Sequence, residues 1–422
     1  MATGSPKRRA SKQLDNGYRI EYDGKKTKEE ILAPLDIEFS SIFTKEGDYK
    51  NNFFFGDNLK ILKGLLNNHD VKGKVKLIYI DPPYASNNIF QSREGEFAYE
   101  DTLRGADFIE FLRERFILLH ELLSNDGSMY VHLDEKMIFE AKIILDEIFG
   151  SNNFQNFIVR KKSNPKNSTK NKYGNITDYI LFYSKSSKFI WNQQFEPWDK
   201  ETGEKEYSYV EESTGRRYKK VPIHAPGVRN GETGKEWKGM LPPQGKHWQY
   251  LPSKLDEMDE RGEIYWSKTG NPRRKIYLDN SPGISVQNVW MDFKDAHNQN
   301  INITGYPTEK NKEILVRIIK ASSNEGDLVL DAFVGSGTTI EVAEELGRRW
   351  IGIDSSPLAL KTNIIRLAKG TKPMGDFKSN QGSIQEELFS SSVLKSGFEV
   401  LMDKEDINKS ILKDVKEWNE LF

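Results

Sequence analysis

The chain has 422 residues, which is room for roughly three domains, and no apolar run reaches the ~18 residues of a membrane span. Its 62 lysines and arginines balance 63 aspartates and glutamates, so a net charge of -1 neither favours nor excludes a nucleic-acid partner. The absence of cysteine excludes disulfides and thiolate chemistry, and the six histidines lack metal-ligand spacing, so no metal is expected.

The first half of the chain predicts alternating strands and helices. Residues 1–50 show little periodicity and predict a tail that leads into the fold. The apolar run Val75–Ile80 predicts a strand, which must stop at the prolines that follow because proline cannot continue a ladder. Apolar residues from Phe108 to Leu123 recur at helical spacing, and a further strand is expected over Ser128–His132.

A second helix is expected after this strand, capped by Asp134 and ended before Gly150. From about Trp191 to Gln299 the periodicity is lost, and this segment predicts an irregular insert. Regular periodicity resumes with the strand Leu328–Leu330, a helix and the strand Trp350–Ile353. The alternation favours a mostly parallel α/β sheet covered by helices.

Three basic runs lie in the middle of the chain. Any one of them is equally typical of a solvated loop, but three runs with interleaved Trp and Tyr favour a polyanion-binding surface. The first holds Arg160, Lys161, Lys162, Lys166, Lys170 and Lys172, the second is Arg216–Lys220, and the third is Arg273, Arg274 and Lys275.

A glycine-rich turn joins a predicted strand to a helix over Asp331–Thr339. Its glycines allow a ligand to approach the backbone, and the helix N-terminus offers N–H groups to an anion. The next predicted strand ends in Asp354, where an acid can hold ribose hydroxyls. No lysine follows the last glycine, so the turn is not a P-loop, and an ordinary tight turn is the competing interpretation.

The segment Asp81-Pro82-Pro83-Tyr84 follows the strand Val75–Ile80. Two prolines make a rigid platform on which the carboxylate of Asp81 and the carbonyl of Pro82 could accept the two N–H bonds of a planar amine. Tyr84 could stack on the ring that carries this amine. A tight proline turn without a ligand is the alternative.

In this order, the two motifs resemble those of the amino-methylating DNA methyltransferases that use S-adenosylmethionine, in the permuted beta group whose catalytic motif comes first. The segments Asn164–Asn167 and Asp178–Leu181 are similar to the modification subunits of type III restriction systems and their solitary relatives. The resemblance covers about Asn51 to Lys369.

The resemblance implies a circularly permuted, Rossmann-like α/β methyltransferase fold. A catalytic half (51–190) and a cofactor half (300–370) would flank a target-recognition insert (191–299), with an N-terminal tail (1–50) and a C-terminal extension (371–422) of unassigned role. It implies catalytic Asp81, Pro82, Pro83 and Tyr84, and cofactor-binding Asp57, Thr308, Asp331, Phe333, Gly335, Ser336, Gly337, Thr338 and Asp354. DNA contacts are expected from Arg160, Lys161, Lys162, Lys166, Arg273, Arg274 and Lys275.

The implied activity is methyl transfer from S-adenosylmethionine to adenine N6 in double-stranded DNA, with base flipping, in the bacterial cytoplasm at the nucleoid. Asp81 favours adenine because cytosine-N4 relatives more often carry serine there. Cytosine-N4 methylation stays open, as do an RNA or protein substrate and a DNA-binding protein that keeps the fold without catalysis. A homodimer and a restriction-endonuclease partner stay open as well; no membrane partner is expected.

Overall fold

A computed structural model describes residues 19–48, 50–83, 89–91, 97–100, 105–165, 171–293, 310–369, 396–408, 412–413 and 415–416. The chain divides into two compact units, the first formed by residues 1–192 and 287–422 and the second by residues 193–286. Within the ranges given above, no helix is long and apolar enough to cross a membrane, and no three His, Cys, Asp or Glu side chains are grouped as metal ligands.

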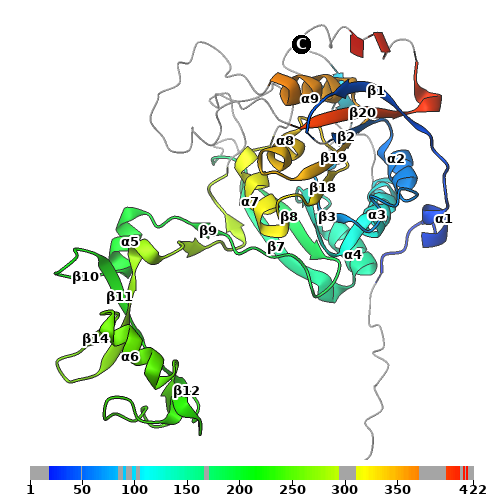
Figure 1. Ribbon diagram of the computed structural model, residues 1–422. Helices are drawn as coiled ribbons and strands as arrows, with labels where there is room; N and C mark the ends of the chain where they lie inside the picture. The colour runs from blue at the N-terminus through cyan, green and yellow to red at the C-terminus, as the bar shows by residue number, and fades with distance from the viewer. Residues whose placement is uncertain are drawn as a thin grey trace, which may run out of the picture. The chain divides into compact units, whose positions relative to one another are not determined.

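The first unit is built on a ten-stranded sheet with the order β1-β20-β2-β19-β18-β3-β6-β8-β7-β17 (Figure 1). Neighbours from β20 to β6 run parallel, whereas β1, β8 and β7 add antiparallel pairs. The strands are β1 (Phe39–Lys45), β2 (Lys50–Phe55), β3 (Val75–Ile80), β6 (Leu123–Leu133), β7 (Phe154–Lys161), β8 (Thr177–Ser184), β17 (Val289–Trp290), β18 (Leu328–Asp331), β19 (Arg349–Asp354) and β20 (Gly397–Asp403).

Helices cover both faces of this sheet. On one side, α2 (Asn58–Leu65), α3 (Gly105–Leu122) and α4 (Ile138–Phe149) pack their apolar side chains against Ile78, Val131 and Leu330. The other side carries α7 (Lys312–Ser322), α8 (Thr338–Glu345) and α9 (Pro357–Lys369) (Figure 1). The short helix α1 (Lys28–Leu32) precedes the sheet, and a small hairpin joins β4 (Ile89–Gln91) to β5 (Phe97–Glu100). The α/β fold class predicted from the sequence is confirmed.

Both ends of the chain contribute strands to the sheet. The first 50 residues were expected to be a tail, but β1 forms an edge of the sheet and pairs with β20. In turn, β20 pairs in parallel with β2, so a strand from the C-terminal extension lies between two strands from the N-terminal region (Figure 1). Its buried side chains, Phe398, Val400 and Met402, provide the apolar contact that holds it there.

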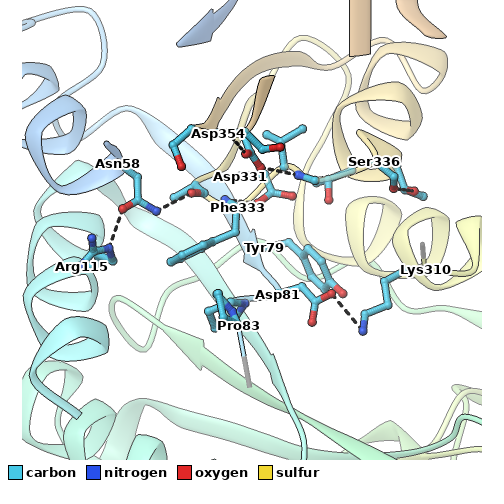
Figure 2. A pocket seen from close by; sticks show the side chains of 18 of the residues that line it. Asn58, Tyr79, Asp81, Pro83, Arg115, Lys310, Asp331, Phe333, Ser336 and Asp354 are labelled. Atoms are coloured by element: carbon cyan, nitrogen blue, oxygen red, sulfur yellow. Dashed lines mark hydrogen bonds and ion pairs between the residues drawn. The ribbon is translucent and has the colours of Figure 1, made fainter. Parts of the chain in front are cut away.

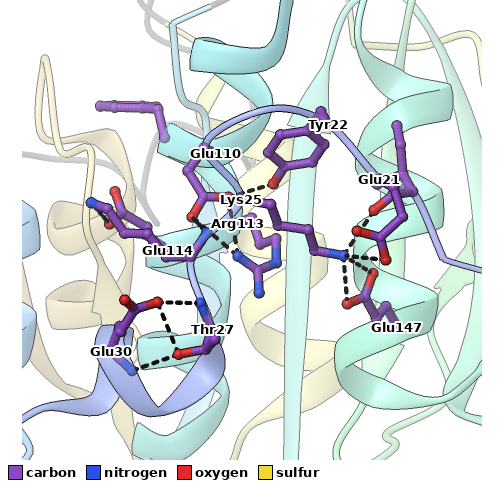
Figure 3. Close-up of polar contacts among 12 residues, drawn as sticks. Glu21, Tyr22, Lys25, Thr27, Glu30, Glu110, Arg113, Glu114 and Glu147 are labelled. Carbon is purple, nitrogen blue, oxygen red and sulfur yellow. Dashed lines mark hydrogen bonds and ion pairs between the residues drawn. The ribbon is translucent and has the colours of Figure 1, made fainter.

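The segment before α1 is fastened to α3 and α4 by polar contacts (Figure 3). Tyr22 donates a hydrogen bond to Glu110 on α3, and Lys25 Nζ lies 3.0 Å from a carboxylate oxygen of Glu147 on α4. A capping box between Thr27 and Glu30 starts α1. Residues 22–30 therefore belong to the folded unit.

Two boundaries in the first half differ from the sequence prediction. The strand β6 begins at Leu123, directly after α3, and a register shift between Val75 and Leu77 accommodates the early start. Asp134 does not cap α4, because its carboxylate accepts from Lys136 N and the helix starts at Ile138 without a side-chain cap. Gly150 does end that helix, as expected.

The second unit has a core of its own, formed by Ile223, Trp237, Trp248, Leu255, Met258 and Ile264. Its four-stranded antiparallel sheet has the order β10-β11-β15-β14, and the pairs β12·β13 and β9·β16 lie outside it. The elements are β9 (Phe195–Glu196), α5 (Lys200–Glu206), β10 (Tyr209–Val210), β11 (Arg217–Pro222), β12 (His224–Pro226), β13 (Lys246–Trp248), α6 (Pro252–Glu260), β14 (Ile264–Trp266), β15 (Pro272–Tyr277) and β16 (Ile284–Ser285).

Candidate functional site

A cavity of about 460 Å³ opens in the first unit where β3, β18 and β19 end (Figure 2). Parallel neighbours end at the same edge of a sheet, so residues that are far apart in sequence meet there. The predicted site residues among its lining are Asp57, Asp81, Pro82, Pro83, Asp331, Phe333, Gly335, Ser336, Thr338 and Asp354. The structure therefore brings the two sequence motifs into one cavity.

The first wall of the cavity is the end of β3. Asp81 and the prolines after it line the cavity, and Lys310 Nζ lies 3.0 Å from Asp81 Oδ2 (Figure 2). Both side chains are largely buried, with 18% and 11% of their surface exposed. An ammonium group thus already occupies one acceptor position of the carboxylate. Tyr84 lies outside the described residues.

The opposite wall is the glycine-rich turn between β18 and α8. Gly337 sits at the N-cap of α8 with φ +86, and a Cβ there would lie 1.9 Å from Asn363 Oδ1, so only glycine fits without displacing that side chain. Arg366 braces the turn, because its guanidinium pairs with Glu341 and donates to Ser336 O at 2.8 Å. Thr308 falls outside the described residues.

Asp331 is buried beneath this turn and is 2% exposed. Burial raises the pKa of Asp331 to about 7, and the neighbouring carboxylates of Asp81 and Asp354 add to the rise. The hydroxyl of Thr339 and the N–H of Phe333, which donates to Asp331 Oδ1 at 2.9 Å, act in the opposite direction. A cation in the cavity would favour the ionised carboxylate.

Asp354 ends β19 and ties this strand to the turn. One of its carboxylate oxygens accepts from Gly335 N at 2.8 Å and the other from Ser356 N at 2.8 Å. Burial raises the pKa of Asp354, whereas these backbone hydrogen bonds favour the charged form. A carboxylate held in this way has a fixed orientation at the cavity wall.

The far end of the cavity is formed by residues that the sequence analysis did not select. Arg115 on α3 donates to Asn58 Oδ1 at 2.6 Å and lies over the ring of Phe111 at 3.5 Å, and Asn58 Nδ2 donates to Ala332 O at 2.8 Å. Burial lowers the pKa of Arg115 to about 10. Asn58 follows the predicted Asp57, but helical spacing alone marks Arg115 and Phe111 only as part of an amphipathic helix.

One predicted DNA contact is corrected by the structure. Arg160 is completely buried on β7, where Nε donates to Asp178 Oδ1 at 2.7 Å and a second guanidinium nitrogen pairs with Oδ2. Its guanidinium is committed to a buried ion pair and is not available to a phosphate. Lys161 and Lys162 are half-buried, and Lys166 lies outside the described residues.

In the second unit, strand alternation divides the cluster Arg273, Arg274 and Lys275. Lys220 on β11 pairs with Lys275 and Pro222 pairs with Arg273, so Lys220, Arg273 and Lys275 lie on one face of the sheet. Tyr209 and Tyr265 flank Lys220, with ring centroids 3.5 and 3.4 Å from its Nζ.

Arg274 points to the other face, toward the small core, and donates to Tyr250 Oη at 2.7 Å. The three cations therefore cannot act as one cluster. The face that carries Lys220, Arg273 and Lys275 with Tyr209 and Tyr265 is called the basic aromatic face below.

A family model and individual relatives both match this chain over most of its length. The family model N6_N4_Mtase, DNA methylase, matches residues 75–364. The chain is 50% identical over 375 residues to the type II methyltransferase M.EcaI of Enterobacter cloacae, covering 87% of this chain and 82% of the relative. It is 26% identical over 409 residues to the StyLTI Mod subunit, a type III restriction-modification enzyme of Salmonella typhimurium, covering 85% of this chain and 61% of that subunit.

Among solved structures, the PvuII DNA methyltransferase, described as cytosine-N4-specific, aligns with a TM-score of 0.42 and 14% identity. The alignment covers 86% of this chain and 99% of that one.

Proposed function

Since the chain belongs to the N6_N4_Mtase family of DNA methylases, we propose that it transfers a methyl group from S-adenosylmethionine to adenine N6 in double-stranded DNA. The observation that carries the proposal is the single cavity in which the platform after β3 faces the glycine-rich turn after β18. The similarity to M.EcaI and to a Mod subunit supports a place in a restriction-modification system.

The turn side of the cavity suits the cofactor. S-adenosylmethionine carries a sulfonium charge, which the acidic groups Asp331 and Asp354 favour. Asp354 is held in one orientation by two backbone N–H groups, and its remaining lone pairs are available to ribose hydroxyls. Phe333 and Phe111, whose ring centroids lie 6.1 Å apart, offer an apolar surface to the adenine ring.

The platform side suits the target amine. The lone pair of an adenine amino group is delocalised into the ring, so the amine is a poor nucleophile. Asp81 and the Pro82 carbonyl can accept both of its N–H bonds, which stabilises the positive charge that develops on nitrogen during transfer. Lys310, which is paired with Asp81 at 3.0 Å, lies beside the position proposed for this amine.

Access to that amine requires the base to leave the duplex. The amino group lies inside the stack, and flipping a base into an active-site cavity costs a few kcal/mol. On the basic aromatic face of the second unit, Lys220 and Arg273 offer cations to the DNA, whereas Lys275 is paired with Glu211 at 2.8 Å. Phosphate contacts would hold the duplex during this step. Adenine is proposed over cytosine because Asp81 stands at the platform position.

The decisive variant is Asp81→Ala. Removal of one preorganised electrostatic partner typically costs about 10²–10³-fold in rate, so single-turnover transfer should fall by this amount while cofactor affinity changes little. Sequencing of modified bases in DNA from cells that express the protein first identifies the methylation site. The measurement is then transfer of label from tritiated S-adenosylmethionine to duplex DNA that contains this site, followed by separation of the nucleosides.

A variant that transfers the label at the parental rate would contradict the mechanism. Label recovered in cytosine would assign the protein to N4 methylation. Label recovered only on RNA or protein would exclude a DNA substrate.

A further inference from the structure

The far end of the cavity holds a buried guanidinium, that of Arg115, which the proposed chemistry does not use. Arg115 lines the cavity from α3 and is 5% exposed. Its Nε donates to Asn58 Oδ1 at 2.6 Å, one terminal nitrogen donates to Phe111 O at 2.8 Å, and the other lies 3.5 Å from Asp57 Oδ1. Each nitrogen of the guanidinium therefore faces a different oxygen.

The partners of Arg115 belong to separate parts of the cavity wall. Asp57 is the N-cap of α2 and Asn58 is the first residue of that helix, whereas Phe111 lies on α3. Asn58 Nδ2 in turn donates to Ala332 O at 2.8 Å, in the turn after β18 (Figure 2). All four partners line the cavity. Arg115 thus joins α2, α3 and the glycine-rich turn, directly or through Asn58.

The amide of Asn58 can serve both of its partners in only one orientation. A guanidinium only donates hydrogen bonds and a backbone carbonyl only accepts them. The Oδ1 atom must therefore face Arg115, and Nδ2 must face Ala332 O. The contact with Arg115 fixes the amide in the orientation that holds the start of α2 against the turn.

The same guanidinium lies over the ring of Phe111. Its central carbon is 3.5 Å from the ring centroid, and Phe111 contacts Phe333 of the turn with centroids 6.1 Å apart. A cation is attracted to an aromatic face, and a planar guanidinium can stack on a ring while its nitrogens donate to several oxygens. Arg115 therefore also holds the apolar surface that is proposed to receive the adenine ring of the cofactor.

We propose that Arg115 is a positioning residue for the cofactor: it holds the start of α2, the ring of Phe111 and the glycine-rich turn at the spacing that the adenine of S-adenosylmethionine requires. The inference rests on the proposed function, because it takes the adenine to lie at this end of the cavity. Arg115 acts through Asn58 and Phe111, and it has no contact with the reacting atoms.

Isothermal titration calorimetry of the whole chain with S-adenosylmethionine, without DNA, tests the proposal. Arg115→Met keeps an unbranched side chain but removes every donor, so cofactor affinity should fall roughly tenfold or more, as expected for the loss of a hydrogen bond to a charged group. Arg115→Lys keeps the charge on a single nitrogen and should recover only part of the affinity. Single-turnover methylation at saturating cofactor should fall less than the affinity, because the platform at Asp81 is unchanged.

Two substitutions of Asn58 test the connection to the turn. In Asn58→Asp the carboxylate still accepts from Arg115 but cannot donate to Ala332 O, so cofactor affinity should fall although the contact with Arg115 is kept. Asn58→Leu removes both contacts, and Arg115→Met should then cost less than it does in the parent. Additive losses in the double variant would overturn the proposed action through Asn58.

Arg113→Met is the matched control. Arg113 also lies on α3, is 4% exposed and pairs with Glu110 at 3.0 Å, but it does not belong to the described lining of the cavity. Loss of this buried guanidinium should lower the midpoint of thermal unfolding about as much as Arg115→Met does, and cofactor affinity should stay near the parental value. Similar unfolding with unequal cofactor affinity separates positioning from a general folding defect.

Parental cofactor affinity in Arg115→Met, or an equal loss of affinity in Arg113→Met, would overturn the proposal and leave Arg115 a structural residue. Failure of the proposed function has a different signature. Asp81→Ala would then transfer methyl groups at the parental rate, while calorimetry would still separate Arg115→Met from Arg113→Met.

Discussion

At the scale of single residues, the buried carboxyl of Asp331 links the site to pH. Its pKa of about 7 in the folded protein lies above the ordinary value of 3.8, so the folded state holds the proton more tightly than the unfolded chain. The stabilisation from this group is therefore complete below the ordinary value and is lost as the pH rises through about 7.

We expect the cofactor-free protein to lose about 1–2 kcal/mol of unfolding free energy from this group between pH 5.5 and 7.5, since one pKa unit corresponds to about 1.4 kcal/mol. Urea unfolding at the two pH values measures the loss. Asp331→Asn cannot ionise and should show a smaller decrease. Equal decreases in the parent and the variant would place the perturbed group elsewhere.

Two contacts between single residues also shape the cavity, one on each of its walls. The ion pair of Lys310 with Asp81 satisfies a carboxylate that the prolines of the platform fix in place. On the opposite wall, the backbone at Gly337 lies so close to Asn363 on α9 that any side chain at position 337 would displace Asn363. Both features are local in space but join segments far apart in sequence.

At the scale of elements, successive side chains of β15 point to opposite faces of the sheet, so its basic residues differ in what they can contact. Arg273 is exposed on the basic aromatic face beside Lys220, whereas Arg274 turns inward to Tyr250. If the exposed face contacts phosphates, then Arg273→Gln and Lys220→Gln should each make the slope of log affinity against log salt shallower by about 0.9.

Arg274→Gln is the matched control for this salt titration, because it removes an equal charge from the neighbouring position and the opposite face. Fluorescence anisotropy with a labelled duplex gives the slopes. A slope that changes for Arg274→Gln and stays constant for Arg273→Gln would show that the basic aromatic face is not the one that contacts phosphates.

At the scale of the whole molecule, the two chain ends complete the sheet. Phe398 on β20 packs near Phe43 on β1 and Trp350 on β19, with ring centroids 5.5 and 6.1 Å away. Phe398→Ala should therefore cost about 3–5 kcal/mol of unfolding free energy, as expected for truncation of a buried phenylalanine.

Phe139→Ala is the control for that substitution, since Phe139 on α4 is 67% exposed and its loss should stay within about 0.5 kcal/mol. Chemical denaturation of both variants gives the comparison. If Phe398→Ala unfolds like the parent, β20 contributes little to the stability of the sheet.

The sequence by itself determined the local parts of the site. Prolines after an apolar run must end a strand, and glycines before a helical pattern must form a tight turn, so the platform at Asp81 and the turn at Gly335 were predictable as strand-end features. The alternation of strands and helices predicted the α/β class in the same way, because each element depends on its own periodicity. The resemblance of these motifs to the amino-methylating DNA methyltransferases pointed to the family that the comparisons confirm.

Only the tertiary structure decided which residues meet. The insertion of β20 beside β2, the ion pair between Lys310 and Asp81, and the burial of Arg160 against Asp178 all depend on pairings between distant segments. A basic run carries no signal that separates the buried Arg160 from the half-buried lysines that follow it, because strand register determines the face and the partner of each side chain. The buried contacts among Tyr79, His132, Asp178 and Arg160 follow from the same cause, because these residues share a face only once four strands have taken their order in the sheet.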